Sequence, residues 1–227
     1  GGAADQNLVL LDDAPIYNTS HLFGFLSVFN PDILQKVESV NGGFPANYGG
    51  RLSSVLNVET RSDVAEKTHG SGNIGLIASR LFIEQPIVKN KASVWISARR
   101  TYIDKLMKAI GEDVPYFFYD VNGKIIVTPT RHDNIQLSFY GGRDVLSIFR
   151  DRNNDGEGFL TSYKSGNNSQ SLRWQRAWSS GWSSTVSLLR TAYSYDILNA
   201  FQDNRSVASS DIEDLGLKIL LSRKLTP

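Results

Sequence analysis

Apolar and polar residues alternate along the chain from about residue 67 onward. In the segment 119–127, one face carries Tyr119, Val121, Ile125 and Val127, and the other carries Asp120, Asn122 and Lys124. The segments 135–140 and 214–222 alternate in the same way. Because successive side chains of a strand point to opposite faces, this pattern predicts strands with one apolar wall and one polar wall.

About eight strands are predicted in this part of the chain. They lie near 67–75, 79–87, 92–102, 116–129, 135–148, 163–178, 182–196 and 210–223. Short connectors (88–91, 130–134 and 179–181) alternate with long ones near 103–115, 149–162 and 197–209. Membrane barrels sort their connectors by length in this way, with tight turns on the periplasmic side. Several predicted strands also exceed the roughly 9–11 residues that a membrane-crossing strand needs.

Aromatic residues gather at the two ends of the predicted strands. Trp174, Trp178 and Trp182 surround one short turn, whereas the aromatic run 116–119 adjoins a long connector. Such clusters are typical of the two interfacial girdles of a membrane barrel. In that arrangement the apolar faces contact lipid and the polar faces line the lumen. We therefore expect Val121, Ile125, Val127, Leu215, Leu217 and Ile219 to face lipid, and Asp120, Lys124 and Lys218 to face the lumen.

Residues 1–66 follow a different pattern, which predicts a small α+β unit. The apolar run 8–11 indicates a covered strand, and two further strands are expected near 36–40 and 52–60. Asn30, Pro31 and Asp32 form a helix start, with Ile33, Leu34 and Val37 as the apolar face of a short helix. The fold class predicted is mainly β. An incomplete antiparallel barrel (67–227) follows the C-terminal part of a plug-like unit (1–66).

Composition narrows the possible functions. The chain has 227 residues with Lys+Arg 24 against Asp+Glu 23, so no basic excess predicts nucleic-acid binding. No run of 18 apolar residues predicts a transmembrane helix. The three histidines (His21, His69 and His132) stand apart without ligand-spaced partners, and no nucleophile or acid–base group is evident. An enzyme is not expected.

Several segments resemble the TonB-dependent outer-membrane receptors. Residues 5–18 (DQNLVLLDDAPIYN) are similar to a plug strand, and 29–38 (FNPDILQKVE) to the elements that follow it. Residues 42–58 (GGFPANYGGRLSSVLNV) resemble the closing segment of the plug, and their sequence is most similar to that of the Bacteroidetes branch. The segments 70–86 and 97–102 resemble the first barrel strands.

The resemblance implies a location in the cell outer membrane and active import of a solute. In this family a barrel of about 22 strands surrounds a plug, and the TonB complex supplies energy through an N-terminal box, expected before Gly1. The remaining strands are expected after Pro227. Implied partners are outer-membrane lipid, a small solute or oligomer, and a surface lipoprotein. A passive or structural barrel within a larger complex, and a soluble β-sandwich binding module, are the alternatives.

Three groups of residues are candidates for function. Gly42, Gly43, Gly49, Gly50 and Arg51 are predicted to form a hinge-like plug loop against the barrel wall, with Phe44, Tyr48 and Arg51 as anchors. The alternative is a rigid double turn without a mechanical role. Arg99 is predicted to face the lumen, where it is a solvated charge or pairs with a plug carboxylate such as Glu38 or Glu59, or with an anionic solute. Asp151, Asn153 and Asp155 occupy positions one, three and five of a calcium loop, whose twelfth position lacks the usual glutamate.

Overall fold

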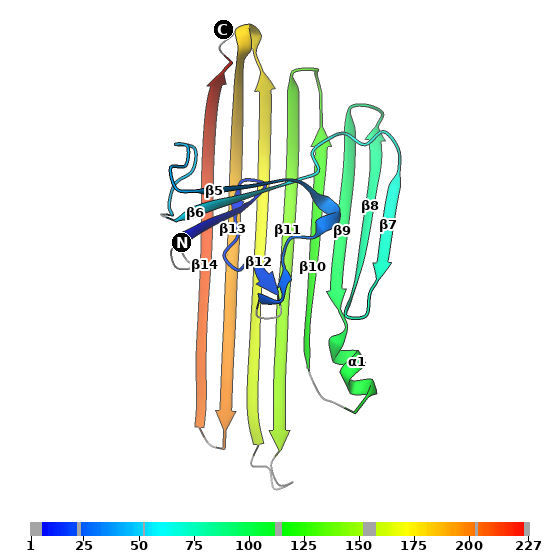
Figure 1. Ribbon diagram of the computed structural model, residues 1–227, viewed down its shortest axis with the longest axis vertical. Coiled ribbons are helices and arrows are strands. Elements are labelled where there is room, and N and C mark those ends of the chain that lie inside the picture. Colours follow the sequence, from blue (N-terminus) through cyan, green and yellow to red (C-terminus); the bar gives the residue numbers. More distant parts are fainter. Residues whose placement is uncertain are drawn as a thin grey trace.

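The computed structural model describes residues 6–21, 24–51, 53–111, 115–151, 158–202 and 204–224, with only the backbone of 150 and 151 described (Figure 1). Its main feature is an antiparallel sheet of eight strands that follow one another in chain order, here called the wall sheet. The strands are β7 (His69–Ile74), β8 (Ala78–Val88), β9 (Ala92–Thr101), β10 (Tyr116–Val127), β11 (Asp133–Asp151), β12 (Gly158–Ala177), β13 (Trp182–Phe201) and β14 (Asn204–Arg223). The predicted number and order of strands are confirmed.

Two predicted long connectors are wrong. Most of 149–162 and of 197–209 belongs to strands, because β11 and β12 pair as far as Asp151 and Gly158, and β13 and β14 as far as Phe201 and Asn204. The connector after β9 is long, as predicted, and it contains helix α1 (Ile103–Ala109). No helix among the described residues is long and apolar enough to cross a membrane.

The two faces of the wall sheet differ as the alternation predicts. Leu215, Leu217 and Ile219 are exposed, whereas Lys124 and Asp120 are buried. The register joins Ile125 with Leu137, Leu172, Leu188 and Leu217 in one outward row across five strands. Outward apolar residues on β11–β14 form continuous rows nearest the short turns, and polar residues such as Gln170, Arg190 and Glu213 follow them toward the loop end, where Phe149 and Val207 are separate exposed apolar side chains. An apolar belt therefore covers the half of these strands nearest the short turns.

The aromatic clusters lie only partly where the girdle hypothesis places them. Trp174, Trp178 and Trp182 are 38–48% exposed at the short-turn end, as expected. In contrast, Tyr116 and Phe118 face inward and are buried. The run 116–119 alternates like any strand, so only its odd-numbered side chains reach the outer face.

The described residues before β7 form a small mixed unit, here called the plug segment. Its four-stranded sheet has the order β2-β1-β6-β5, with β1 and β6 parallel, and β3 and β4 form a separate hairpin. The strands are β1 (Asn7–Leu11), β2 (Ala14–Pro15), β3 (Ser20–His21), β4 (Leu26–Ser27), β5 (Leu34–Asn41) and β6 (Ser54–Thr60). The helix predicted after Asn30 is a single 3-10 turn, Pro31–Ile33, capped by the Asn30 side chain. Extended backbone resumes at Leu34, which leaves Val37 54% exposed instead of on a helix face.

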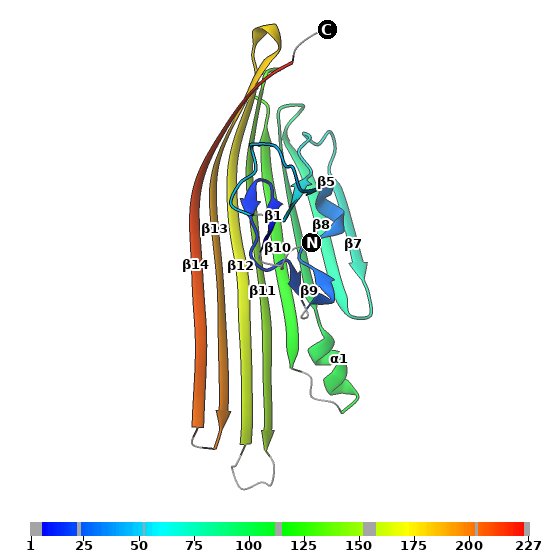
Figure 2. The ribbon, with the colours of Figure 1, turned by 60° about the vertical axis from the view of Figure 1, so that its left-hand side comes forward.

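The plug segment packs against the inward face of the wall sheet (Figures 1 and 2). Two buried clusters contain side chains from both parts. In one, Ile33 of the plug segment meets Phe82, Trp95 and Ile126 of the wall. In the other, Tyr140 of the wall meets a plug cluster that includes Leu11 and Val28. The apolar core is therefore shared between the two parts.

The glycine-rich loop 42–51 has backbone angles that explain part of its composition. Gly43 and Gly50 have φ of +58° and +83°, a region that L side chains rarely adopt. The Lys218 ammonium of the wall lies 5.3 Å from the Tyr48 ring, so this predicted anchor does contact the wall. Arg51 is exposed and donates a hydrogen bond to the Gly50 carbonyl, so its role as an anchor stays a prediction. A hinge role for the loop stays a prediction.

We expect Gly50→Ala to destabilise the plug segment by about 1–2 kcal/mol, because an L residue is strained at this φ. The matched control is Gly49→Ala. Open space surrounds a Cβ at both positions, but Gly49 is not in the positive-φ region. Denaturant unfolding monitored by hydrogen exchange of β5 and β6 measures both effects. Equal loss in the two variants would contradict the backbone explanation.

Candidate functional site at the plug–wall interface

A buried ion pair joins the plug segment to the middle of the wall. The Lys124 ammonium of β10 lies 2.9 Å from an Asp12 carboxylate oxygen and donates a hydrogen bond to the Thr60 carbonyl. Lys124 is 2% exposed. Asp12 also accepts hydrogen bonds from the backbone N–H and the hydroxyl of Thr60. Burial of this charge is tolerated because each group is paired and hydrogen-bonded.

Asp13 makes a second set of contacts farther along the wall. Its carboxylate accepts hydrogen bonds from Lys218 of β14 at 2.8 Å and from the Ser187 hydroxyl of β13 at 3.0 Å. Arg173 of β12 lies 3.6 Å away. Burial tends to raise the pKa of Asp13, but the charges of Arg173 and Lys218 and these hydrogen bonds together hold it below its usual value. One plug carboxylate thus contacts three wall strands.

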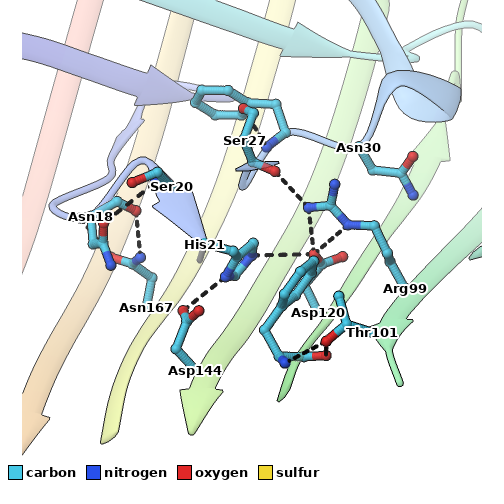
Figure 3. Close-up of polar contacts among 12 residues, drawn as sticks. Asn18, Ser20, His21, Ser27, Asn30, Arg99, Thr101, Asp120, Asp144 and Asn167 are labelled. Atoms are coloured by element: carbon cyan, nitrogen blue, oxygen red, sulfur yellow. Dashed lines mark hydrogen bonds and ion pairs between the residues drawn. The ribbon is translucent and has the colours of Figure 1, made fainter. Parts of the chain in front are cut away.

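A third cluster surrounds His21, in the hairpin of the plug segment nearest the loop end of the strands (Figures 1 and 3). The His21 Nδ1 atom lies 2.8 Å from Asp144 of β11, and Nε2 lies 3.3 Å from Asp120 of β10. The imidazole is 2% exposed and stacks on Phe118 with ring centroids 4.0 Å apart. Arg99 of β9 forms an ion pair with Asp120 at 2.6 Å and donates to the carbonyl of Ser27 in the plug segment.

Charge balance in this cluster favours a protonated His21. Two carboxylates, Asp120 and Asp144, face one permanent cation, Arg99. A neutral imidazole would leave one uncompensated negative charge in a buried site, which is costly. Burial tends to lower the pKa of His21, but its contacts with Asp120 and Asp144 raise it above its ordinary value. In the protonated ring Nδ1 donates a hydrogen bond to Asp144, and Nε2–H faces Asp120 as an ion pair.

Sequence reasoning found some of these residues and missed others. Arg99 faces inward, but its partner is Asp120 and not Glu38 or Glu59. His21 was interpreted as an isolated histidine, because its partners follow it by 99 and 123 positions. A usable signal existed, since Asp120 was already assigned to the inward face of its strand.

The calcium candidates are not described. Asn153 and Asp155 lie outside the described residues, and of Asp151 only the backbone is described. Within the described ranges, no three His, Cys, Asp or Glu side chains are grouped as a metal site.

Beside the His21 cluster, the inward face of the wall carries tyrosines that adjoin the plug segment. The ring centroids of Tyr17 in the plug segment and Tyr193 in β13 are 6.3 Å apart. The ring centroids of Tyr193 and Tyr195 are also 6.3 Å apart. Asn18 is joined to Asn167 of β12 by two hydrogen bonds. Burial and a hydrogen bond to Asp214 raise the pKa of Tyr17 to about 12, so it stays a neutral donor. Aromatic faces and amide groups of this kind suit a solute that both stacks and hydrogen-bonds.

Solved structures show the same architecture. The siderophore receptor PirA from Acinetobacter baumannii matches 94% of this chain with a TM-score of 0.66 at 18% identity. A G324V mutant of the ferric enterobactin receptor PfeA from Pseudomonas aeruginosa matches 94% with a TM-score of 0.64 at 15% identity. The chain spans 37% and 38% of the length of these two proteins. No family profile and no curated protein sequence matches the chain.

Proposed function

We propose that this chain, which has the fold of the TonB-dependent outer-membrane receptors, is the gated part of an importer in the outer membrane. The wall sheet contributes to the barrel, and the plug segment closes its lumen. The plug is held by contacts that must be broken before a solute passes. The similarity to receptors of the Bacteroidetes branch stays a prediction.

The observation that carries this proposal is the chemistry of the plug–wall interface. Asp12, Asp13 and His21 each contact the wall through charged groups. Apolar packing between the two parts is limited to a few side chains per cluster. Polar contacts depend on geometry and exchange readily for contacts with water. Such an interface suits a plug segment that dissociates from the wall under force and then binds to it again.

The energy source for import and the class of solute are further parts of the proposal. We propose that the TonB complex pulls the plug through a segment outside this chain. PirA and PfeA are receptors for a siderophore and for ferric enterobactin, so iron–siderophore chelates are the first solutes to test. The solute is proposed to contact Tyr17 of the plug segment and Tyr193 and Tyr195 of the wall while the plug is closed.

Cross-linking the plug to the wall is expected to abolish import. Asn30 of the plug segment donates a hydrogen bond to Ser97 of β9 at 2.6 Å. In a full-length receptor, Asn30→Cys with Ser97→Cys is oxidised during folding in the periplasm to a reducible disulfide, which tethers these two parts at a buried contact. We expect uptake of a radiolabelled ferric chelate to fall to background and to recover after reduction.

The control uses an equivalent pair inside the plug segment. Ser54 of β6 donates a hydrogen bond to Asn7 of β1, also at 2.6 Å. Asn7→Cys with Ser54→Cys is expected to leave uptake near the wild-type rate. Normal uptake by the tethered Asn30–Ser97 variant, at equal surface levels, would rule out a plug that moves against this part of the wall.

A further inference from the structure

The short-turn end of the wall sheet forms a continuous rim. The backbone N–H of Thr128 donates to the Lys91 carbonyl, and that of Ala177 donates to the His132 carbonyl. Lys224 donates in the same way to Gly181. These bonds join the turn after β8, the turn after β10, the turn after β12 and the end of β14 (the upper end in Figure 1). The four segments therefore present their side chains together.

This rim carries a strong excess of positive charge. Six cationic side chains are found in 88–92, 128–134, 175–184 and 222–224: Lys89, Lys91, Arg131, Arg176, Arg223 and Lys224. The same stretches contain a single carboxylate, that of Asp133. Asp133 is already occupied by Arg176, Trp174 and Thr130. The acidic residues Asp63 and Glu66 belong to the connector that docks on the inward-facing Ser93, on the other side of the sheet.

Three of the cations have no partner among the described residues. Lys89, Lys91 and Arg131 are exposed, and none of them makes an ion pair with a described side chain. They line a hollow of about 910 Å³ between the turns, together with Thr128, His132 and Ser184. All of its lining residues belong to β8–β13 and their turns, so the hollow does not depend on the free edge at β14.

The same rim carries the features of a membrane interface. Arg176 stacks on Trp178 at 4.5 Å, and Arg223 on Trp182 at 5.4 Å. The apolar belt begins directly below, with Leu172 and Leu188 on its first rows. Tryptophan rings prefer the level of lipid headgroups. The unpaired cations therefore lie at the height where phosphate groups are found.

We propose that the rim binds the phosphates of anionic phospholipids in the membrane leaflet at the short-turn end. Lys89, Lys91 and Arg131 contact the headgroup in the hollow, and the tryptophans contact the glycerol region beside it. Lipid fits this site better than a soluble anionic partner, because the cations, the tryptophans and the belt succeed one another in the order of headgroup, interface and acyl chain. This binding is independent of solute import.

The test compares the full-length receptor with two triple variants. The first replaces Lys89, Lys91 and Arg131 with glutamine. The control replaces three exposed cations at the opposite end of the strands, Lys105, Lys108 and Arg205, with glutamine. Each protein is reconstituted in phosphatidylcholine vesicles with or without about 30% phosphatidylglycerol, a range in which anionic lipid attracts basic residues strongly. Bound phosphatidylglycerol is counted after extraction, and the unfolding midpoint is recorded in both vesicles.

We expect wild type and control to enrich phosphatidylglycerol around the protein and to unfold at a higher temperature in its presence. The rim variant is expected to lose about tenfold in this preference and to show no rise in midpoint. Equal enrichment by the rim variant, or equal loss in both variants, would overturn the proposal. A rise in midpoint produced by free inorganic phosphate in phosphatidylcholine vesicles would also overturn it, in favour of a site for soluble anions.

Discussion

Replacing Asp12 with alanine is expected to weaken docking of the plug segment on the wall by about 3–5 kcal/mol of free energy. The change leaves the Lys124 ammonium, which is 2% exposed, without its carboxylate. A buried unpaired charge is far more costly than the pair is favourable. Hydrogen exchange of the β1 and β6 amides in the full-length receptor measures the loss, and ion conductance through the receptor in a planar bilayer reports the opened lumen.

A paired replacement separates this effect from a general loss of packing. Asp12→Asn combined with Lys124→Met removes both charges, keeps similar volume and keeps an acceptor for Thr60, and we expect it to dock nearly as well as wild type. The exposed pair of Lys36 and Glu38 provides a second comparison, since Glu38→Ala should change docking by less than about 1 kcal/mol. If Asp12→Ala leaves conductance and exchange unchanged, the buried pair does not hold the plug.

Docking of the plug segment is expected to weaken as pH rises above neutrality. The folded-state pKa of His21 is raised. Its contribution to docking is therefore complete below the pKa of a free histidine, about 6.5. That contribution is lost as pH rises through the raised value, because the neutral ring no longer balances Asp120 and Asp144. Conductance of the full-length receptor, measured from about pH 6 upward, should increase.

Two histidine variants test the origin of this pH dependence. His21→Gln keeps a polar side chain but cannot be protonated, so docking should be weaker at pH 6 and nearly independent of pH. His69→Gln changes an exposed histidine of β7 and should leave the wild-type profile intact. The groups that face His21, namely Asp120, Asp144 and Arg99, and Tyr116, which bonds to Asp144, remain in place in both variants. A His21→Gln receptor with an unchanged pH profile would assign the effect to another group.

The wall strands were predictable because their signal is local. The alternation of Val121, Lys124 and Ile125 needs no partner to be recognised, and it fixed both the strand and its faces. The strand ends were predicted less well. In 197–209 the outward side chains are as polar as the inward ones, since this stretch lies beyond the apolar belt, so the contrast that marks a strand disappears. Backbone pairing continues there regardless.

The interface was mostly hidden from sequence reasoning. The contacts of Asp12 with Lys124 and of His21 with Asp144 join residues more than a hundred positions apart. The prediction placed Phe118 in a lipid-facing girdle, whereas its side chain faces inward. An aromatic side chain packs equally well against lipid or against a plug, so its type does not reveal the face. Arg99 was placed on the correct face, but its partner depends on the neighbouring strand register, which a single strand does not reveal.

The length of β11–β14 determines the order in which a solute meets the protein. Strands of 20 residues span about 66 Å along their axes, whereas a lipid-facing belt is about 25 Å tall. Much of the wall therefore stands clear of the bilayer as a tall collar, which continues beyond the register row of Asp144, Ser165 and Tyr195 at which His21 is bound. Under the proposed import function, a solute is captured at the collar while the plug is still closed. Capture and release into the periplasm are then separate kinetic steps, so a receptor whose plug is cross-linked to the wall is expected to bind solute at its normal association rate.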